Sequence, residues 1–361
     1  MSETIEEPPV KKMRTNEDID SIIDKINNSE NNLTPVIEER YYEKAPNVRC
    51  FVGTINNPKD ISKTLVLLND KLPLKDLEHL KRVRTKKVLL CLADDIVGNY
   101  IENYIDTTVP EIKDVFVNFE EIEVTSLPPK IKKQFDEANK IWPCNFHPNK
   151  YSEKLVSGNF FDDKELKMHK LYMAVAFHAA KFYVNNESYA LKDVNVSVVA
   201  DPAIDSIVAV AINNKDHPIQ HAAMLAIDKV AATQNGGAWV ESNREYVLRG
   251  VDEDLQSYLK RQIPNLNFGA RKFVTKSEAK DSNESINNVP YLCTGYYIYT
   301  LKEPCLMCSM GLVHARIKKV FFCYNNESGA LKSTVKLHTI KDLNHHFEVF
   351  TGFLYTSDIA S

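Results

Sequence analysis

The sequence predicts an α/β protein, with a layered α/β domain that follows a smaller α+β domain. Two observations support this prediction. Across residues 48–124, β-branched and aromatic runs alternate with helical patterns in the order strand, helix, strand, candidate helix and strand. From residue 162 onward, a long helical pattern precedes the order strand, strand, helix, strand, helix and strand, which is typical of a sheet covered by helices.

The smaller domain is expected over residues 46–140. Its clearest helical pattern is DISKTLVLLNDKL, in which Ile61, Leu65 and Leu68 recur at spacings of four and three, as on one face of a helix. Strands are expected in three runs that are rich in β-branched and aromatic residues: VRCFVGTI (48–55), KKVLLCLA (86–93) and DVFVNFEEIEV (114–124).

The larger domain is expected over residues 141–361. The run DDKELKMHKLYMAVAFHAAKFYV (162–184) predicts a core-facing helix, because most of its apolar residues recur every three or four positions. Strands follow in NVSVVADPA and DSIVAVAIN, and later in YLCTGYYIYT and RIKKVFFCY, with a helix between the last two. The polar stretch at about 235–288 is expected to be an insertion with a short helix around 252–261.

The composition favours a soluble intracellular protein. The chain has 361 residues, 43% of them hydrophobic, and its net charge of −4 gives no global sign of nucleic-acid binding. Its apolar runs are far shorter than the roughly 20 residues of a membrane-spanning helix, and the N-terminus lacks the apolar core of a secretory signal. Seven scattered cysteines, an odd number, favour reduced thiols and a metal site over a disulfide framework.

Residues 1–45 are expected to form a disordered tail, because they are rich in Glu, Asn, Lys and Asp and poor in aromatic residues. The cluster Lys11-Lys12-Met13-Arg14 matches a nuclear-import signal, although so short a basic cluster often occurs by chance. We therefore expect the protein in the nucleus and the cytoplasm.

His221, Cys305 and Cys308 have the pattern of a zinc site. The two cysteines follow Pro304 at the expected start of a helix, so both side chains can point inward from its first turn. The positive end of the helix dipole favours thiolates there, and His221 supplies a third ligand from the start of a second expected helix. Three such protein ligands suit Zn²⁺. The alternative is an ordinary pair of buried cysteines near a turn.

Ala223 stands where a zinc-dependent base deaminase needs a glutamate. Such enzymes combine His-x-Glu with Pro-Cys-x-x-Cys, and the glutamate moves protons between the zinc-bound water, the base and the leaving amine. General acid–base catalysis contributes about 10² to 10⁴ in rate, and a methyl group cannot supply it. Asp228 should lie almost two helical turns beyond His221, and Glu303 is expected to be structural. The alternative is a substitute base that the insertion supplies.

Beyond these motifs, the chain from about residue 48 to its end resembles a known family. The segment YTLKEPCLMCSMGLVHARIKKVFFCYNNESGAL (299–331), together with HLKRVR, WPCNFH and DHPIQHAAM, is similar to the non-catalytic subunits of eukaryotic heterodimeric tRNA adenosine deaminases. These subunits belong to the cytidine/deoxycytidylate deaminase superfamily. Pro-Cys-x-x-Cys occurs throughout this superfamily. The missing glutamate, together with an N-terminal domain that carries HLKRVR, points specifically to the non-catalytic subunits.

The resemblance implies a cytidine deaminase-like three-layer α/β/α domain, with a five-stranded sheet, and an N-terminal domain that helps to capture tRNA. It also implies a heterodimer with a catalytic subunit that keeps its glutamate, and this heterodimer converts the wobble adenosine of several tRNAs to inosine. This chain would be silent alone, with a structural Zn²⁺ held by His221, Cys305 and Cys308. The fourth zinc ligand would be water, a backbone group or a residue of the partner, and the sequence does not distinguish these three.

A basic segment of nine residues is the main candidate for RNA binding. Its cations are Lys81, Arg82, Arg84, Lys86 and Lys87. Because phosphate contacts dominate nucleic-acid affinity, such a cluster suits the tRNA backbone. The alternative is an ordinary solvated surface between a helix and a strand.

Two other functions stay open. The chain would be an independent nucleotide deaminase of the dCMP type if an unconventional base replaced the missing glutamate. It would be a zinc-stabilised interaction module if the fold no longer served deamination. Turnover by the isolated chain would indicate the first, and normal wobble inosine in cells that lack the protein would indicate the second.

Overall fold

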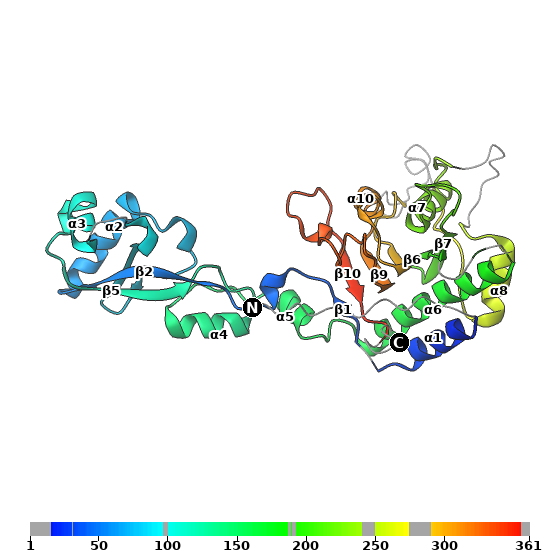
Figure 1. The fold of residues 1–361 in the computed structure, drawn as a ribbon, viewed down its shortest axis with the longest axis horizontal. Coiled ribbons are helices and arrows are strands. Elements are labelled where there is room, and N and C mark those ends of the chain that lie inside the picture. The colour runs from blue at the N-terminus through cyan, green and yellow to red at the C-terminus, as the bar shows by residue number, and fades with distance from the viewer. Residues whose placement is uncertain are drawn as a thin grey trace, which may run out of the picture. The chain divides into compact units, whose positions relative to one another are not determined.

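The chain divides into two compact units, which Figure 1 shows in a computed structural model. The residues that the structure describes are 16–30, 32–96, 100–186, 189, 193–239, 250–273 and 290–354. The smaller unit is Glu38–Ser157, and the larger unit combines Met1–Ile37 with Gly158–Ser361. In the order of the chain, the smaller unit is therefore inserted into the larger one.

The smaller unit contains a four-stranded antiparallel sheet with the order β3-β4-β2-β5. Its strands are β2 (Asn47–Ile55), β3 (Val83–Arg84), β4 (Lys87–Leu92) and β5 (Phe116–Thr125). Its helices are α2 (Ile61–Lys71), α3 (Ile101–Thr108), α4 (Lys132–Ile141) and α5 (Lys150–Val156). Short 3-10 helices join them: η1 (Glu39–Tyr41), η2 (Pro58–Asp60), η3 (Lys75–Leu77), η4 (Ala93–Asp95) and η5 (Pro110–Ile112). The expected strands and helices of this region are confirmed.

Side chains of β4 show that this sheet is covered on both faces. Val88 and Leu90 belong to a core that includes Ile105 of α3, whereas Leu89 belongs to a second core that includes Trp142 at the end of α4. Successive side chains of a strand point to opposite faces of its sheet. A strand buried on both faces is apolar at consecutive positions, which explains the uninterrupted run VLLCL in this strand.

The larger unit contains a six-stranded mixed sheet with the order β1-β10-β9-β8-β6-β7. Its strands are β1 (Thr34–Pro35), β6 (Val196–Asp201), β7 (Ser206–Ile212), β8 (Tyr297–Lys302), β9 (Lys319–Tyr324) and β10 (Glu348–Thr351). Strands β8, β9 and β10 run parallel, while β6 is antiparallel to β7 and β8. The four strands expected here from local patterns are confirmed as β6 to β9, and β10 is the fifth strand that the resemblance implied. The pairing of β1 with β10 adds a sixth strand that was not expected.

Helices cover both faces of this sheet (Figure 1). They are α1 (Asn16–Asn28), α6 (Asp163–Asn186), α7 (Ala222–Ala232), α8 (Glu253–Gln262) and α10 (Leu306–His314), with the 3-10 helix η8 (Leu337–Thr339). Phe321 packs against His169 of α6, whereas its neighbour Phe322 belongs to the core that α7 and α10 share. Because neighbouring residues of a strand face opposite sides, the two helical layers flank the sheet. The expected three-layer α/β/α architecture is confirmed.

The N-terminal segment differs from the expected disordered tail. Helix α1 lies against α6 and buries Ile19, Ile23 and Ile26, and β1 pairs with β10 at the edge of the sheet. The three isoleucines recur at spacings of four and three, as on one face of a helix. The polar residues between them dominate the composition, which is why composition suggested disorder.

The domain boundaries shift accordingly. The expected boundaries at residues 45 and 140 become Glu38 and Ser157, because the first ordered residues pack on the larger unit and α5 belongs to the smaller one. Residues 1–15, with the Lys11–Arg14 cluster, lie outside the described residues. No helix in the described ranges is long and apolar enough to cross a membrane.

Part of the expected insertion pairs with the outer strand β7. The N–H of Gly250 donates to the carbonyl of Val208 at 2.9 Å, and the N–H of Val210 donates to the carbonyl of Gly250 at 3.0 Å. A Cβ at position 250 would lie 2.8 Å from the Val208 carbonyl oxygen, so this approach requires glycine. The expected short helix is confirmed as α8, while residues 240–249 and 274–289 lie outside the described part.

Candidate metal centre

His221 is positioned by the start of helix α7. It is the capping residue before the first turn, with an extended backbone (φ −70°, ψ 153°), and its carbonyl accepts the N–H of Leu225 at 3.0 Å. Two hydrogen bonds hold the loop before it: Asn214 donates its N–H to the Gln220 carbonyl at 2.9 Å and its side-chain amide to the Gln220 side chain at 2.7 Å. The backbone is therefore fixed on both sides of the imidazole.

Cys305 and Cys308 come from the start of helix α10. Cys305 caps the helix, and Cys308 lies buried in the first turn. Helix α10 approaches α7 closely because Gly311 has no side chain, and a Cβ there would lie 2.6 Å from the Sδ of Met224. This close packing helps to bring the N-terminal ends of the two helices together.

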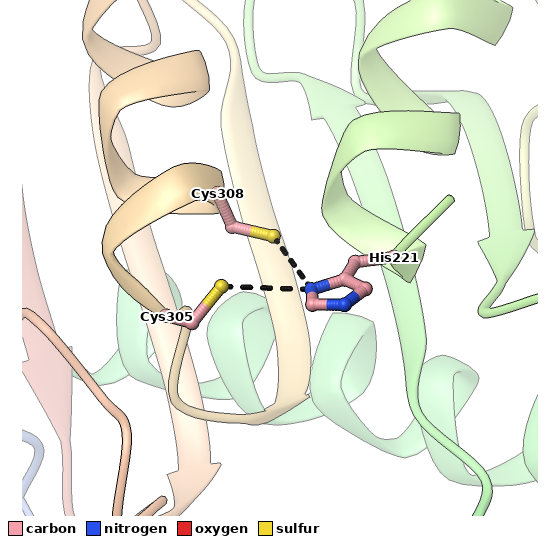
Figure 2. A group of neighbouring side chains, drawn as sticks. All are labelled: His221, Cys305 and Cys308. Atoms are coloured by element: carbon pink, nitrogen blue, oxygen red, sulfur yellow. Dashed lines mark hydrogen bonds between the residues drawn. The ribbon is translucent and has the colours of Figure 1, made fainter. Parts of the chain in front are cut away.

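The three side chains converge (Figure 2). The Nδ1 of His221 lies 3.5 Å from the Sγ of Cys305 and 3.5 Å from the Sγ of Cys308, and the three donor atoms lie within 4.8 Å of one another. A tetrahedral Zn²⁺ with bonds of about 2.3 Å to sulfur and about 2.0 Å to nitrogen would hold its nitrogen and sulfur ligands about 3.5 Å apart. The spacing and the chemistry of these donors both fit zinc.

The two thiols differ in acidity. A hydrogen bond from the Cys308 thiol lowers the pKa of Cys305 to about 5. The same bond, together with burial, raises the pKa of Cys308. Because zinc binds thiolates, one proton must leave Cys308 when a metal enters. The backbone N–H of Met224, which also bonds to Cys308, favours that thiolate.

Ala223 is buried just after the histidine. Its exposed fraction is 3%, and it belongs to the same apolar core as Ala226 and Leu312. In the described part of the chain, the group of candidate metal ligands consists of one imidazole and two thiols, with no carboxylate. The described residues therefore place no carboxylate proton acceptor within this group.

The two acidic residues that the sequence singled out near the motif have other partners, as expected. Asp228 accepts the backbone N–H of Ala238 at 2.5 Å and that of Trp239 at 3.4 Å, more than one turn along α7. Glu303 is 1% exposed, and one of its oxygens accepts the backbone N–H of Leu331 at 2.9 Å. Neither residue replaces the missing glutamate.

Comparisons with known proteins agree with this site. Residues 48–142 match the tRNA-specific adenosine deaminase TAD3 N-terminal domain, and residues 167–324 match the cytidine and deoxycytidylate deaminase zinc-binding region. A Danio rerio protein named "Probable inactive tRNA-specific adenosine deaminase-like protein 3" is 30% identical over 341 residues, which cover 89% of this chain and 91% of that protein. The chain belongs to the TAD3 family.

Other TAD3 proteins are similar over most of their length. The Arabidopsis thaliana "tRNA-specific adenosine deaminase TAD3" is 26% identical, with 86% of this chain and 92% of the relative covered. The Saccharomyces cerevisiae "tRNA-specific adenosine deaminase subunit TAD3" is also 26% identical, with 81% of each covered. The family resemblance inferred from the sequence is confirmed, and the zinc-binding region of the match spans all three converging residues.

Within the TAD3 N-terminal domain, Arg82 has a different role from the one expected. All five N–H donors of its guanidinium bond to acceptors of the protein itself. The acceptors are the carbonyls of Leu89 (3.2 Å), Leu68 (3.2 Å), Leu72 (2.6 Å) and Leu90 (3.2 Å) and the side chain of Asn69 (2.9 Å). Burial lowers the pKa of Arg82 to about 10. A guanidinium with no donor left has none to offer a phosphate, so Arg82 joins the end of α2 to β4 and is removed from the RNA-binding candidates.

The other four cations of this TAD3 segment are exposed. Arg84 donates one N–H to the carbonyl of Ile141 at 2.7 Å, and Lys87 forms an ion pair with Glu120. Arg84, Lys86 and Lys87 line a groove of about 760 Å³ on the smaller unit. Glu120 and Glu123 line the same groove, so three cations lie beside two carboxylates there and the excess of positive charge is small.

Two glycines shape the site and were not identified from the sequence. Gly311 allows α7 and α10 to approach, and a Cβ at Gly329 would lie 2.2 Å from the carboxylate carbon of Glu303. No local pattern separates a glycine that makes room for a neighbour from an ordinary turn glycine. Both contacts join segments that are distant in the chain.

Proposed function

We propose that this TAD3-family chain is the non-catalytic subunit of a tRNA-specific adenosine deaminase, which converts the wobble adenosine of tRNA anticodons to inosine. One observation carries the proposal: a complete His/Cys/Cys donor set with the buried Ala223 two residues after its histidine. The names of the relatives support it, since the Danio rerio protein is called probable inactive and the Saccharomyces cerevisiae protein is called a subunit.

In this proposal, His221, Cys305 and Cys308 hold Zn²⁺ in a structural role. In an active deaminase, bound zinc activates a water molecule for attack on the base. Here the residue at the proton-transfer position ends in a methyl group, so the donor set serves to fasten the start of α7 to the start of α10. A structural zinc site contributes directly to the free energy of folding.

A silent subunit implies a catalytic partner. We infer a heterodimer with a deaminase subunit that retains the glutamate of His-x-Glu, because the proton-transfer step has to be performed by some carboxylate. We also propose that this complex is present in the nucleus and the cytoplasm, and the Lys11–Arg14 cluster supports the nuclear location.

The smaller unit is the proposed tRNA-binding part. Lys81, Arg84, Lys86 and Lys87 are exposed, and three of them line one groove. Lys and Arg side chains that contact phosphates give affinity without reading bases, which suits a subunit that serves several tRNAs.

The decisive test compares the isolated chain with the chain in its native complex. Purified alone, it should hold about one zinc per molecule and release no ammonia from adenosine, cytidine or dCMP. Isolated from native cells, it should bring with it a deaminase subunit and activity that forms wobble inosine in tRNA. Separate expression of that partner and reconstitution of the pair should reproduce the activity.

Two results would replace this proposal. Deamination by the isolated chain, abolished by Cys305→Ser, would make it an independent deaminase. Normal wobble inosine in cells that lack the protein would make it a zinc-stabilised interaction module.

A further inference from the structure

Glu303 is a buried carboxylate directly before the Pro304-Cys305 turn. Its exposed fraction is 1%, and the ion pairs among the described residues do not include it. A buried charge without an opposite charge is costly unless hydrogen bonds compensate it. The partners of this carboxylate therefore explain why it is tolerated.

Backbone N–H groups from one segment, residues 325–334, supply these partners. The Oε1 atom of Glu303 accepts the N–H of Leu331 at 2.9 Å, of Lys332 at 2.5 Å and of Ser333 at 3.0 Å. The Oε2 atom accepts the hydroxyl of Ser333 and the N–H of Asn326 at 3.4 Å. Consecutive N–H groups that point at one anion form a backbone nest, here filled by a side chain of the protein itself.

The same segment also contacts the metal-ligand turn through the backbone. The N–H of Ala330 donates to the carbonyl of Pro304 at 2.9 Å, and Cys305 and Gly329 form an isolated antiparallel bridge. A Cβ at Gly329 would lie 2.2 Å from the carboxylate carbon of Glu303. While the carboxylate of Glu303 occupies the nest, a side chain at position 329 would therefore clash with it.

We infer that Glu303 is a positioning residue for the metal site: by binding the nest of the 325–334 segment, it holds that segment against Cys305 and so slows the release of the metal. The inference rests on the proposed zinc site. Groups that hold metal ligands in place typically change metal affinity by about 10- to 100-fold although they do not touch the metal. Glu303 is bonded to the segment and is adjacent to the ligand turn, so its effect reaches the metal through Cys305.

The test measures the rate at which a chelator in excess removes zinc from the full chain. The variants are Glu303→Ala, Gly329→Ala and the double variant. Each single variant should release zinc about 10-fold faster or more. The double variant should release it within about twofold of Glu303→Ala, because removal of the carboxylate already frees the space that a Cβ at position 329 needs.

A matched control separates positioning from general stability. Asp201 is also 1% exposed in the larger unit, where its carboxylate accepts a bond from Arg271 at 2.6 Å, and it is not part of the metal site. Asp201→Asn should lower the unfolding temperature but leave zinc release within about twofold of the native rate. The absorption spectrum of the cobalt-substituted protein, which reports ligand geometry, should change in Glu303→Ala and stay native in Asp201→Asn.

Amide hydrogen exchange adds a readout that needs no metal. The N–H groups of Leu331, Lys332 and Ser333 should lose protection in metal-free Glu303→Ala, while α6 keeps its protection. A native chain that binds no zinc would overturn the zinc proposal and this inference together. Zinc in the native chain with equal release rates in Glu303→Ala and Asp201→Asn, or unchanged protection of the three amides, would overturn this inference alone.

Discussion

The Nδ1 of His221 lies 3.5 Å from the Sγ of Cys308, although 87 residues separate them in the chain. The two residues sit at the starts of different helices, and neither helix alone can hold a metal. The contact depends on the close packing of α7 and α10 around Gly311. A zinc ion at this point would join the two helices that cover one face of the sheet.

Replacement of Cys308 by serine should lower the affinity for zinc by more than about 100-fold, since even groups outside the ligand set contribute about 10- to 100-fold. A hydroxyl is a poor zinc ligand beside a thiolate. Metal analysis of the purified variant at fixed free zinc checks this. The control is Cys323→Ala, since Cys323 is buried in β9 away from the donor group. Equal zinc content in the two variants would contradict the assigned ligand.

Replacement of Arg82 by lysine should destabilise the smaller unit by about 2–3 kcal/mol, because several buried carbonyls lose their donors. Lysine keeps the positive charge but cannot reproduce the planar guanidinium geometry. Urea unfolding followed by the fluorescence of Trp142, in chains that also carry Trp239→Phe, measures the loss. If Arg82 served RNA instead, the lysine variant would unfold like the native protein and bind tRNA more weakly.

The combined replacement of Lys81, Arg84 and Lys86 by alanine should weaken tRNA binding and reduce its salt dependence. Each lost phosphate contact removes about 0.7 to 0.9 from the slope of log affinity against log salt, so we expect the loss of three contacts to reduce the slope by about 2 to 3. Zinc content should stay native, because all three residues belong to the smaller unit. A slope identical to that of the native protein would exclude this surface as a phosphate contact.

The stability of the larger unit should decrease as the pH decreases, partly because of His169. Burial lowers the pKa of this imidazole to about 3, and the positive charge of Lys319 adds to the effect. The unfolded chain takes up the proton near pH 6.5, so the contribution of His169 is complete above pH 6.5 and is lost progressively toward pH 3. The loss is about 1.4 kcal/mol per pH unit within this window.

The variant His169→Gln should therefore show a flatter dependence of unfolding free energy on pH between 6.5 and 4 than the native protein. His314→Gln is the control, because His314 is exposed on α10. Denaturant unfolding at several pH values provides the comparison. Parallel profiles for the native protein and His169→Gln would show that this histidine does not titrate as its burial requires.

The success of the strand and helix predictions has a local cause. The spacing of Ile61, Leu65 and Leu68 identifies a helix, and the run 195–203 identifies a strand, because side-chain periodicity is set by backbone geometry within a few residues. Helix α1 was not predicted because its three buried isoleucines lie among acidic and amide residues. Its order comes from contact with α6, more than 130 residues further along the chain.

The same distinction separates the two groups of candidate residues. The zinc-type motif and the alanine at the proton-transfer position were legible in the sequence, because ligand identity and the absence of a carboxylate are properties of single side chains. The structure adds that their donor atoms meet. The sequence showed the positive charge of Arg82 but not which groups its guanidinium binds. Its acceptors belong to α2, the loop after α2 and β4, which only the fold brings together.

The sequence by itself thus determined the fold class, the three metal-ligand candidates and the absence of a glutamate at position 223. Three-dimensional packing bonded Arg82 to α2 and β4 of the smaller unit, made residues 16–30 part of the larger unit and placed Glu303 in the 325–334 nest. The physical reason is the distance along the chain over which each property is set. Periodicity and ligand chemistry act within a turn or a side chain, whereas a hydrogen bond needs a partner that only folding brings within about 3 Å.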